Sequence, residues 1–305
     1  MNVLLIGGNG FIGSHLVDIL LSKQHKIRVF DYSYEKFRKP LCNVDYRIFS
    51  LDNIDELTEA LVGIDVVFHL SCSLVPSTSN LDFEYDIRNN IIPTLKLLDI
   101  MIKLKTNKIV FFSSGGAVYG NPTLIPTPEE DALNPISSYG IIKVITEYYL
   151  RLYEKLFELK ALIVRPSNPY GPRQGHLMTQ GVISTFLNKI KENDDLTVFG
   201  DGNVIKDYIY ITDLIEASYC LTMKQETGVY NIGSGEGISI NSIIQTIKEI
   251  TRFNSKIKHI ETKKYDVQKS ILDIKKLRDT INWTPRISLK EGIKKHWEWI
   301  NRSDR

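Results

Sequence analysis

The sequence opens with MNVLLIGGNGFIGS (residues 1–14), an apolar run that meets a glycine-rich turn without a spacer. This order predicts a buried strand, a tight turn and a helix. In such a unit Gly7 turns the backbone sharply, Gly10 lets it approach a pyrophosphate, and Gly13 lets the helix pack closely on the strand. The phosphates would lie at the helix N-terminus, where unpaired N–H groups and the helix dipole favour negative charge.

A second apolar run, residues 27–30, ends in Asp31. An acidic residue about twenty positions after such a turn typically binds the ribose hydroxyls of a dinucleotide. The alternative is an ordinary surface turn residue, and the strand, turn and helix before it favour the cofactor. Asp31 would repel a 2′-phosphate, and the nearest following cations are Lys36 and Arg38. We therefore expect NAD rather than NADP.

Further apolar runs alternate with helical patterns along the chain. Strands are expected at 46–49, 65–70 and 108–112, and helices at 55–61, 83–105 and 138–157. This alternation predicts an α/β fold with a doubly wound parallel Rossmann sheet and ligands at the carboxyl ends of its strands. Pro93 predicts a kink or a late helix start, because it cannot donate a backbone hydrogen bond. His69 lies inside an apolar strand, and we interpret it as a hydrogen-bonded core residue rather than a base.

Composition excludes several classes of protein. A chain of 305 residues with 43% hydrophobic content can form one large α/β domain, or one domain and a smaller lobe. A net charge of +2 without a basic stripe gives no sign of a nucleic-acid partner. Cys42, Cys72 and Cys220 are too far apart to suggest disulfides or a zinc site, so no metal and a cytoplasmic location are expected. No stretch resembles a signal peptide or a membrane span.

Tyr139 and Lys143 lie four residues apart at the start of a helical pattern, so they share one face of the helix. An ammonium group beside a tyrosine stabilises its phenolate. Lowering a phenol pKa from about 10 to about 7 requires roughly 4 kcal/mol. A close lysine and a positively charged nicotinamide could supply this together, which makes Tyr139 a candidate general base.

Several motifs together resemble the extended short-chain dehydrogenase/reductases, in particular the UDP-galactose 4-epimerase-like branch that acts on nucleotide sugars. Besides the residues above, the shared motifs are Asp52, Ser113-Ser114, Val118-Tyr119-Gly120, Arg165-Pro166-x-Asn168-Pro169-Tyr170-Gly171, Gly200-Asp201-Gly202 with Asp207-Tyr208, and Asn282-Trp283-x-Pro285. The resemblance runs nearly from end to end. It implies an NAD-binding Rossmann domain over residues 1–171, to which some later segments return, and a smaller α/β lobe over 172–305 that mainly binds the nucleotide sugar.

The resemblance also implies a homodimer formed through the helices 83–105 and 138–157. The apolar stripe Ile87, Ile91 and Leu95 fits this role, and it fits packing against the sheet equally well. Synthesis of surface-polysaccharide precursors is the pathway that the family suggests.

Carried over residue by residue, the resemblance assigns roles to the following positions. It places at the cofactor Gly7, Gly10, Phe11, Ile12, Gly13, Asp31, Asp52, Asn53, Leu70, Ser71, Asn90, Ser113, Tyr139, Lys143 and Pro166. It places at the substrate Ser114, Asn168, Lys206, Lys263, Asp266 and Ser270. Tyr139, Lys143 and Ser114 are the catalytic candidates.

Three departures from the family pattern bear on the site. Gly115 stands where relatives carry a serine or threonine, so Ser114 or a water must supply that hydrogen bond. Lys206 and Lys263 replace arginines and keep the charge without the bidentate geometry. Ser270 replaces a bulky aromatic at the sugar, which leaves room for an N-acetyl group. Leu74 or a residue of the 175–180 loop could instead close that space.

The resemblance implies a choice of reaction. Sugar 4,6-dehydratases carry a Thr-Asp-Glu set where this chain has Ser114-Gly115-Gly116, with no carboxyl group to act as acid or base. We therefore expect redox-neutral 4-epimerisation of a UDP-sugar through a 4-keto intermediate, with UDP-GlcNAc and UDP-GalNAc slightly favoured over UDP-Glc and UDP-Gal. The alternatives are a nucleotide-sugar reductase or non-C4 epimerase, and a non-catalytic NAD-binding protein.

Overall fold

The computed structural model describes residues 1–72, 79–175, 181–261 and 267–302, and the chain divides into two compact units. The first unit comprises Met1–Val118, Pro135–Arg165 and Ser218–Tyr230. The second comprises Tyr119–Asn134, Pro166–Ala217 and Asn231–Arg305. The chain thus enters the second unit three times, at Tyr119, Pro166 and Asn231, and the second of these entries lies five residues before the Gly171 boundary expected from the sequence.

The first unit is built on a seven-stranded sheet with the strand order β10-β6-β5-β4-β1-β2-β3. Its strands are β1 (Asn2–Ile6), β2 (Lys26–Asp31), β3 (Val44–Ile48), β4 (Val66–His69), β5 (Lys108–Phe112), β6 (Lys160–Pro166) and β10 (Gly228–Ile232). Neighbours from β6 to β3 pair in parallel. The expected doubly wound parallel α/β sheet is therefore confirmed.

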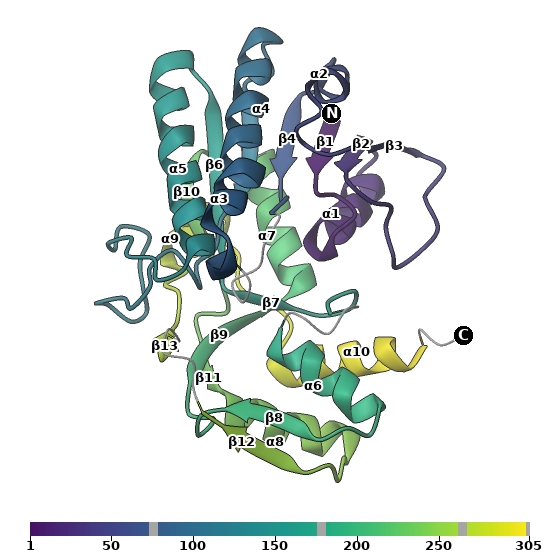
Figure 1. Ribbon diagram of the computed structural model, residues 1–305, viewed down its shortest axis with the longest axis vertical. Coiled ribbons are helices and arrows are strands. Elements are labelled where there is room, and N and C mark those ends of the chain that lie inside the picture. Colours follow the sequence, from purple (N-terminus) through teal and green to yellow (C-terminus); the bar gives the residue numbers. More distant parts are fainter. Residues whose placement is uncertain (73–78, 176–180, 262–266, 303–305) are drawn as a thin grey trace. The chain divides into compact units, whose positions relative to one another are not determined.

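Helices pack against this sheet through fully buried side chains (Figure 1). The helices are α1 (Phe11–Ser22), α2 (Ile54–Leu61), α4 (Ile92–Lys103), α5 (Ser138–Phe157) and α7 (Ile211–Met223). On one face Leu57, Leu97 and Leu150, from α2, α4 and α5, form a single cluster with the strand residues Leu4 and Phe111. Each fully buried leucine or phenylalanine contributes about 1.5–3 kcal/mol, so this cluster fixes the carboxyl ends of the central strands.

The expected helix over residues 83–105 is interrupted near its middle. It consists of α3 (Phe83–Asp86), a five-residue π-helix η2 (Ile87–Ile91) and α4, and the 3₁₀ turn η1 (Ser79–Leu81) precedes it. Pro93 lies in the first turn of α4, directly after the π-helix, at the point where the hydrogen-bonding pattern of the helix changes. The expectation of a kink or a late helix start at Pro93 is thus confirmed.

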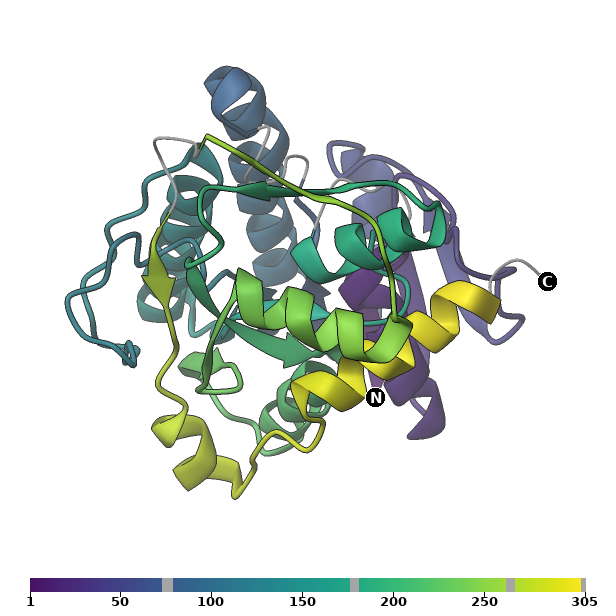
Figure 2. The same ribbon diagram turned by 90° about the horizontal axis from the view of Figure 1, so that it is seen from below.

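The second unit contains two small sheets and a group of helices (Figure 2). One sheet joins β7 (Asn168–Tyr170), β9 (Ile205–Tyr210), β11 (Gly237–Ser239) and β13 (Lys269–Ser270); the other pairs β8 (Leu196–Phe199) with β12 (Ile257–Ile260). Its helices are α6 (Val182–Lys191), α8 (Ile240–Thr251), α9 (Lys275–Ile281) and α10 (Leu289–Arg302). α10 packs against both α6 and α8. Across the described part of the chain, no helix has the length and apolar character needed to cross a bilayer.

Candidate functional site

The glycine-rich turn brings the end of β1 close to the end of β4 and to the start of α1. Gly7 has a φ of +80°, and a Cβ there would lie 2.8 Å from the Ser71 nitrogen. A Cβ at Gly13 would lie 2.4 Å from the Gly7 oxygen, so both positions exclude a side chain. At Gly10 the nearest atom to such a Cβ is 3.4 Å away, which leaves this side of the turn open. The open side adjoins the N-terminus of α1. The N-cap of this helix is Gly10, which has no side chain to bind the first N–H groups of the helix.

Asp31 ends β2 with its carboxylate directed at this turn. It is 8% exposed, and its Oδ2 accepts a hydrogen bond of 2.9 Å from the backbone N–H of Asn9. Burial raises the pKa of the Asp31 carboxyl, and backbone hydrogen bonds oppose that effect. An open glycine turn, a helix N-terminus and an acidic strand end together fit the pyrophosphate and ribose of a dinucleotide.

The two residues expected near the adenine lie in the turn that follows β3. Both Asp52 and Asn53 are exposed. The Asn53 side chain caps α2, because its Oδ1 accepts a hydrogen bond of 3.3 Å from the Glu56 N–H. Asp52 therefore has the more freely placed side chain of the two.

Tyr139 and Ser114 meet at the carboxyl end of β5. The Ser114 hydroxyl hydrogen-bonds to the phenolic oxygen of Tyr139, which favours the phenolate. Burial of that oxygen has the larger effect and raises the pKa of Tyr139 above its ordinary value. The partner expected in place of Gly115 is therefore in contact with the candidate base.

Lys143 lies one helical turn after Tyr139 and is 4% exposed. Its ammonium is 5.6 Å from the centre of the Tyr139 ring, and it donates a 2.8 Å hydrogen bond to the Phe112 carbonyl. Burial lowers the pKa of Lys143, while nearby acidic groups raise it. Because burial raises the pKa of Tyr139, the expected lowering of this pKa requires the charge of the nicotinamide as well as that of Lys143.

Several contacts within the first unit hold the start of α5 in place. Ser137 caps the helix by accepting a 3.2 Å hydrogen bond from the Gly140 N–H. The Tyr139 N–H donates to the hydroxyl of Ser79 at 3.1 Å, and the Ser138 hydroxyl donates to the buried carboxylate of Asp86 at 2.6 Å. The orientation of Tyr139 thus depends on residues more than fifty positions earlier in the chain.

Asn90 lies in the π-helix and is buried. Its side-chain amide donates to both the carbonyl oxygen and the Oδ1 of Asp86, at 2.8 and 2.7 Å. With Ser71, Cys72 and Lys143, it lines a cavity of about 10 Å³. This volume suits a single water molecule.

Ser113 differs from Ser114 in its partner. Its hydroxyl donates to the Oε1 of Glu147 at 2.5 Å, and Glu147 also forms an ion pair with Arg165 at 2.6 Å. Both members of that pair are 1% exposed. The side chain of Ser113 therefore belongs to a buried network under α5, and only its backbone remains to serve a cofactor.

His69 is confirmed as a hydrogen-bonded core residue. The Thr94 hydroxyl donates to the Asn90 carbonyl, so it accepts from the Nε2–H of His69 at 2.9 Å. This arrangement fixes the neutral tautomer. Burial lowers the pKa of His69 to about 3, so its ring stays uncharged.

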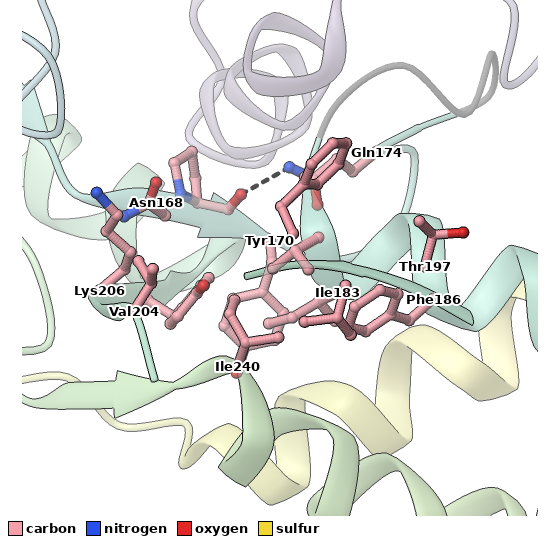
Figure 3. A pocket seen from close by; sticks show the side chains of 15 residues that line it. Asn168, Tyr170, Gln174, Ile183, Phe186, Thr197, Val204, Lys206 and Ile240 are labelled. Atoms are coloured by element: carbon pink, nitrogen blue, oxygen red, sulfur yellow. Dashed lines mark hydrogen bonds between the residues drawn. The ribbon is translucent and has the colours of Figure 1, made fainter. Parts of the chain in front are cut away.

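The second unit holds a cavity of about 310 Å³, shown in Figure 3. Asn168 and Lys206, two of the expected substrate residues, are among its lining residues. The remaining wall is largely apolar and aromatic and includes Tyr170, Ile183, Phe186, Phe199, Val204, Tyr208 and Ile240. Asn168 donates to the Asp207 carbonyl at 2.8 Å, and the Lys206 ammonium hydrogen-bonds to the Val267 carbonyl.

The other expected substrate residues and Pro166 lie elsewhere. Ser270 is 7% exposed and pairs with Lys206 across β13 and β9. Lys263, Asp266, Leu74 and residues 176–180 lie outside the described residues. Pro166 is the buried last residue of β6, and Leu70 follows β4, where its N–H donates to the Ile6 carbonyl at 2.9 Å.

Sequence reasoning missed Ser79, Asp86, Cys72 and Gln174. Ser79 and Asp86 position α5, Cys72 lines the small cavity beside Lys143, and Gln174 lines the cavity of the second unit. None belongs to a motif that local spacing identifies. Among these residues, only Asp86 has a feature that the sequence shows. It is a charged residue inside an amphipathic helical pattern, and a carboxylate that is buried needs hydrogen-bond partners.

Comparison with known proteins identifies the family. Residues 3–233 match the family model for the NAD dependent epimerase/dehydratase family. The chain is 34% identical to a putative UDP-glucose 4-epimerase of Methanocaldococcus jannaschii, with 99% of each chain covered. It is also 34% identical to dTDP-4-dehydro-6-deoxyglucose reductase of Escherichia coli, with 96% of this chain and 95% of the relative covered.

Among solved structures, the UDP-glucose 4-epimerase of Thermotoga maritima, determined with UDP-glucose, superposes with a TM-score of 0.94. It is 36% identical, and all of both chains is covered. The expected resemblance to the extended short-chain dehydrogenase/reductases is confirmed. The chain therefore belongs to the NAD-dependent epimerase/dehydratase family, and its cofactor is NAD.

Proposed function

We propose that the protein catalyses the redox-neutral 4-epimerisation of a UDP-sugar. The observation that carries this proposal is the hydrogen bond between Ser114 and Tyr139 at the carboxyl end of β5, with Lys143 one helical turn away. Neither Gly115 nor Gly116 offers the carboxyl group that an elimination of water would need. The UDP-glucose 4-epimerase of Thermotoga maritima shares the fold over the full length of both chains, and the putative UDP-glucose 4-epimerase of Methanocaldococcus jannaschii is similar in sequence over 99% of each chain.

In this proposal each catalytic side chain has one role. Tyr139 removes the proton of the C4 hydroxyl and returns it after the sugar has exposed its opposite face. Ser114 has a single O–H, so in the substrate complex it donates to this C4 oxygen instead of to Tyr139, as the oxygen becomes a carbonyl and again an alcohol. NAD, when bound, supplies a reversible hydride acceptor. Lys143 keeps Tyr139 oriented and adds positive charge near the phenolate.

The buried phenol sets a condition on this mechanism. Burial raises the pKa of Tyr139, so the phenolate needs further positive charge before it can act near neutral pH. The oxidised nicotinamide carries such a charge. We therefore expect proton removal by Tyr139 to depend on bound oxidised NAD, and activity to fall as the pH drops below the pKa of the tyrosine in the holoenzyme.

We assign the first unit to NAD and the cavity of the second unit to the nucleotide part of the substrate. Figure 3 shows Lys206 and Asn168 at one end of the cavity and apolar side chains around the rest. A cation and an amide beside an aromatic wall suit a diphosphate joined to a nucleoside. Lys206 binds the diphosphate through a single ammonium group, because a lysine lacks the paired N–H donors of an arginine guanidinium.

The direct test is to incubate the purified protein with a panel of UDP-sugars and to identify the products by NMR. Interconversion of a C4 epimer pair without net NADH formation or consumption is expected. The reductase among the relatives motivates the second candidate. Stoichiometric loss of added NADH with a reduced sugar product would select the reductase instead.

Ser114→Ala is expected to lower kcat by about 30- to 1,000-fold, since a donor to a developing oxyanion contributes roughly 2–4 kcal/mol. The KM for the UDP-sugar should change little, because this interaction strengthens in the transition state. Ser22→Ala, which removes a hydroxyl from an exposed position at the end of α1, is the control and should keep full activity. Full activity of Ser114→Ala would show that water or another group fills this role.

We propose further that the N-acetylated substrates UDP-GlcNAc and UDP-GalNAc are accepted. Ser270 is small, buried and paired with Lys206. If it adjoins the sugar, Ser270→Tyr should selectively weaken turnover of UDP-GlcNAc relative to UDP-Glc, because overpacking costs about 1–3 kcal/mol. Parallel kinetics on both sugars measure this selectivity. An equal loss on both would remove Ser270 from sugar selection.

We also propose that the protein is a homodimer. Large apolar side chains lie exposed along one side of α5, at Ile141, Tyr148, Leu152 and Leu156, which are 44–61% exposed. Phe83 and Ile87, in the segments packed next to α5, are 61% and 47% exposed. Of the expected stripe, only Ile87 is exposed, because Ile91 is buried and Leu95 packs on the core. An apolar surface on two adjacent helices is typical of an interface.

Leu152→Glu is expected to convert the dimer to a monomer, because it places a charge in the middle of this apolar surface. Size-exclusion chromatography with light scattering, run over a range of concentrations, measures the mass. Val62→Glu, at the exposed C-cap of α2, is a control that adds the same charge outside this surface. A wild-type mass of one chain at all concentrations would contradict the homodimer.

A further inference from the structure

Asn9 lies in the glycine-rich turn of the first unit, directly before the N-cap of α1, and it is 6% exposed. Its amide nitrogen donates a 2.7 Å hydrogen bond to the carbonyl of Ser33, which lies two residues after the end of β2. β1 and β2 are neighbouring parallel strands (Figure 1). The side chain of Asn9 therefore connects the turn at the end of one strand to the loop at the end of the next.

The same two residues hold the carboxylate of Asp31. The backbone N–H of Asn9 donates to its Oδ2 at 2.9 Å, and the backbone N–H of Ser33 donates to its Oδ1 at 3.4 Å. Each carboxylate oxygen thus has a backbone donor, and the side chain of Asn9 joins these two donors to each other. The three hydrogen bonds form a closed ring, which fixes the position and the plane of the carboxylate.

The bond from Ser33 to Asp31 is the weakest part of this ring. Its length of 3.4 Å exceeds the range of about 2.7–3.2 Å that is usual between an N–H nitrogen and an oxygen acceptor. Tyr32 and Tyr34, on either side of Ser33, are 80% and 57% exposed, so neither side chain anchors this loop in the core. The hydrogen bond from the Asn9 amide therefore has the main part in keeping Ser33 beside Asp31.

The carboxylate of Asp31 keeps room for a ligand. The backbone N–H groups of Asn9, Tyr32 and Ser33 bind it, whereas a carboxylate has about four acceptor sites. One acceptor site is left, which matches a single ribose hydroxyl. An acidic residue at this place in a dinucleotide-binding unit binds such a hydroxyl.

We propose that Asn9 is a positioning residue for NAD. By holding Ser33 to the glycine-rich turn, its side chain keeps the Asp31 carboxylate where it accepts a hydrogen bond from the adenosine ribose. This inference rests on the assignment of Asp31 to the ribose, and it does not depend on the reaction at the sugar. The Oδ1 atom of Asn9 is buried without a hydrogen-bond partner in the described part of the chain, so the side chain adds little to stability. Its effect should therefore appear in ribose recognition.

A double-mutant cycle between protein and ligand tests this role. Full-length wild type and Asn9→Ala, both freed of bound nucleotide, are titrated by calorimetry with NAD and with its 2′-deoxyadenosine and 3′-deoxyadenosine analogues. On wild type, the analogue that lacks the hydroxyl bound by Asp31 should bind about 10- to 100-fold more weakly than NAD, because a hydrogen bond to a charged group is lost. On Asn9→Ala most of this difference should vanish, although Asp31 is still present.

Two further variants separate positioning from packing. Asn9→Asp keeps the size of the side chain and replaces the donor nitrogen with an oxygen. Above neutral pH it should also lose the difference between NAD and the analogue, which keeps the test valid if Asn9→Ala is poorly folded. Asn2→Ala is the matched control at the opposite end of β1, where the amide nitrogen donates to the Gly63 carbonyl at 2.7 Å. It should retain the full difference.

Retention of the full difference by either Asn9 variant would overturn the inference, even if that variant binds all three ligands more weakly. Such a result would give Asn9 a general structural role in the turn. If wild type binds both analogues as tightly as NAD, the assignment of Asp31 to the ribose fails, and the inference fails with it. The proposed epimerisation is measured on the UDP-sugar, so its failure is distinguishable from both of these results.

Discussion

Tyr139→Phe is expected to lower kcat by about 10²- to 10⁴-fold, the range typical of a general acid–base group. The substitution removes one oxygen atom and keeps the ring, so NAD and UDP should bind with unchanged affinity. Turnover by NMR and binding by calorimetry measure the two properties separately. A loss below tenfold would place the base elsewhere.

A control on the same helix makes this result specific. Tyr148→Phe removes a phenolic hydroxyl from an exposed position of α5, nine residues later, and should leave kcat unchanged. The pH profile adds a second readout. The active form of Tyr139 is the phenolate, so wild-type kcat/KM should fall as the pH drops through the pKa of this group in the holoenzyme. The residual activity of Tyr139→Phe should lack that dependence.

Local sequence patterns predicted the parts of the site that depend on neighbouring residues. The turn at Gly7, Gly10 and Gly13 follows a strand directly, so its geometry is set by a few consecutive backbone angles. Tyr139 and Lys143 share a helix face because the helical period puts residues four apart together. Family resemblance added the expectation that Ser114 or a water replaces the residue missing at Gly115, and Ser114 lies in contact with Tyr139.

The remaining parts of the site depend on contacts between distant segments. The Ser79 hydroxyl and the Asp86 carboxylate reach α5 across 60 and 52 positions, and no periodicity records such a pairing. The effect of burial on the Tyr139 pKa depends on everything packed around the phenol, so the sequence alone does not reveal it. No sequence pattern identifies Gln174, because a glutamine in a loop has no distinguishing feature until the fold places it in the lining of a cavity.

The network of Glu147, Arg165 and Ser113 leads to the largest expected effect on stability. Arg165 donates to both carboxylate oxygens of Glu147, at 3.0 and 2.6 Å, and each side chain is 1% exposed. Removing one member of such a pair leaves a buried charge without compensation, which costs about 3–5 kcal/mol. Glu147→Ala should therefore lower the free energy of unfolding by about this amount, measured by urea denaturation of the NAD-free protein.

A surface pair on the same unit provides the matched control. Glu84 forms an ion pair with Arg88 one helical turn away, and the two side chains are 72% and 69% exposed. Since exposed pairs contribute about 0–1 kcal/mol, Glu84→Ala should change the unfolding free energy by less than 1 kcal/mol. The double variant Glu147→Leu with Arg165→Met should recover much of the loss, because it removes both charges and keeps the volume filled. A loss below 1 kcal/mol for Glu147→Ala would mean that water or another group compensates the Arg165 guanidinium. Because the ion pair joins Glu147 of α5 to Arg165 of β6, its loss should also loosen the helix that carries Tyr139, and the kcat of Glu147→Ala should fall at urea concentrations where the protein is still folded.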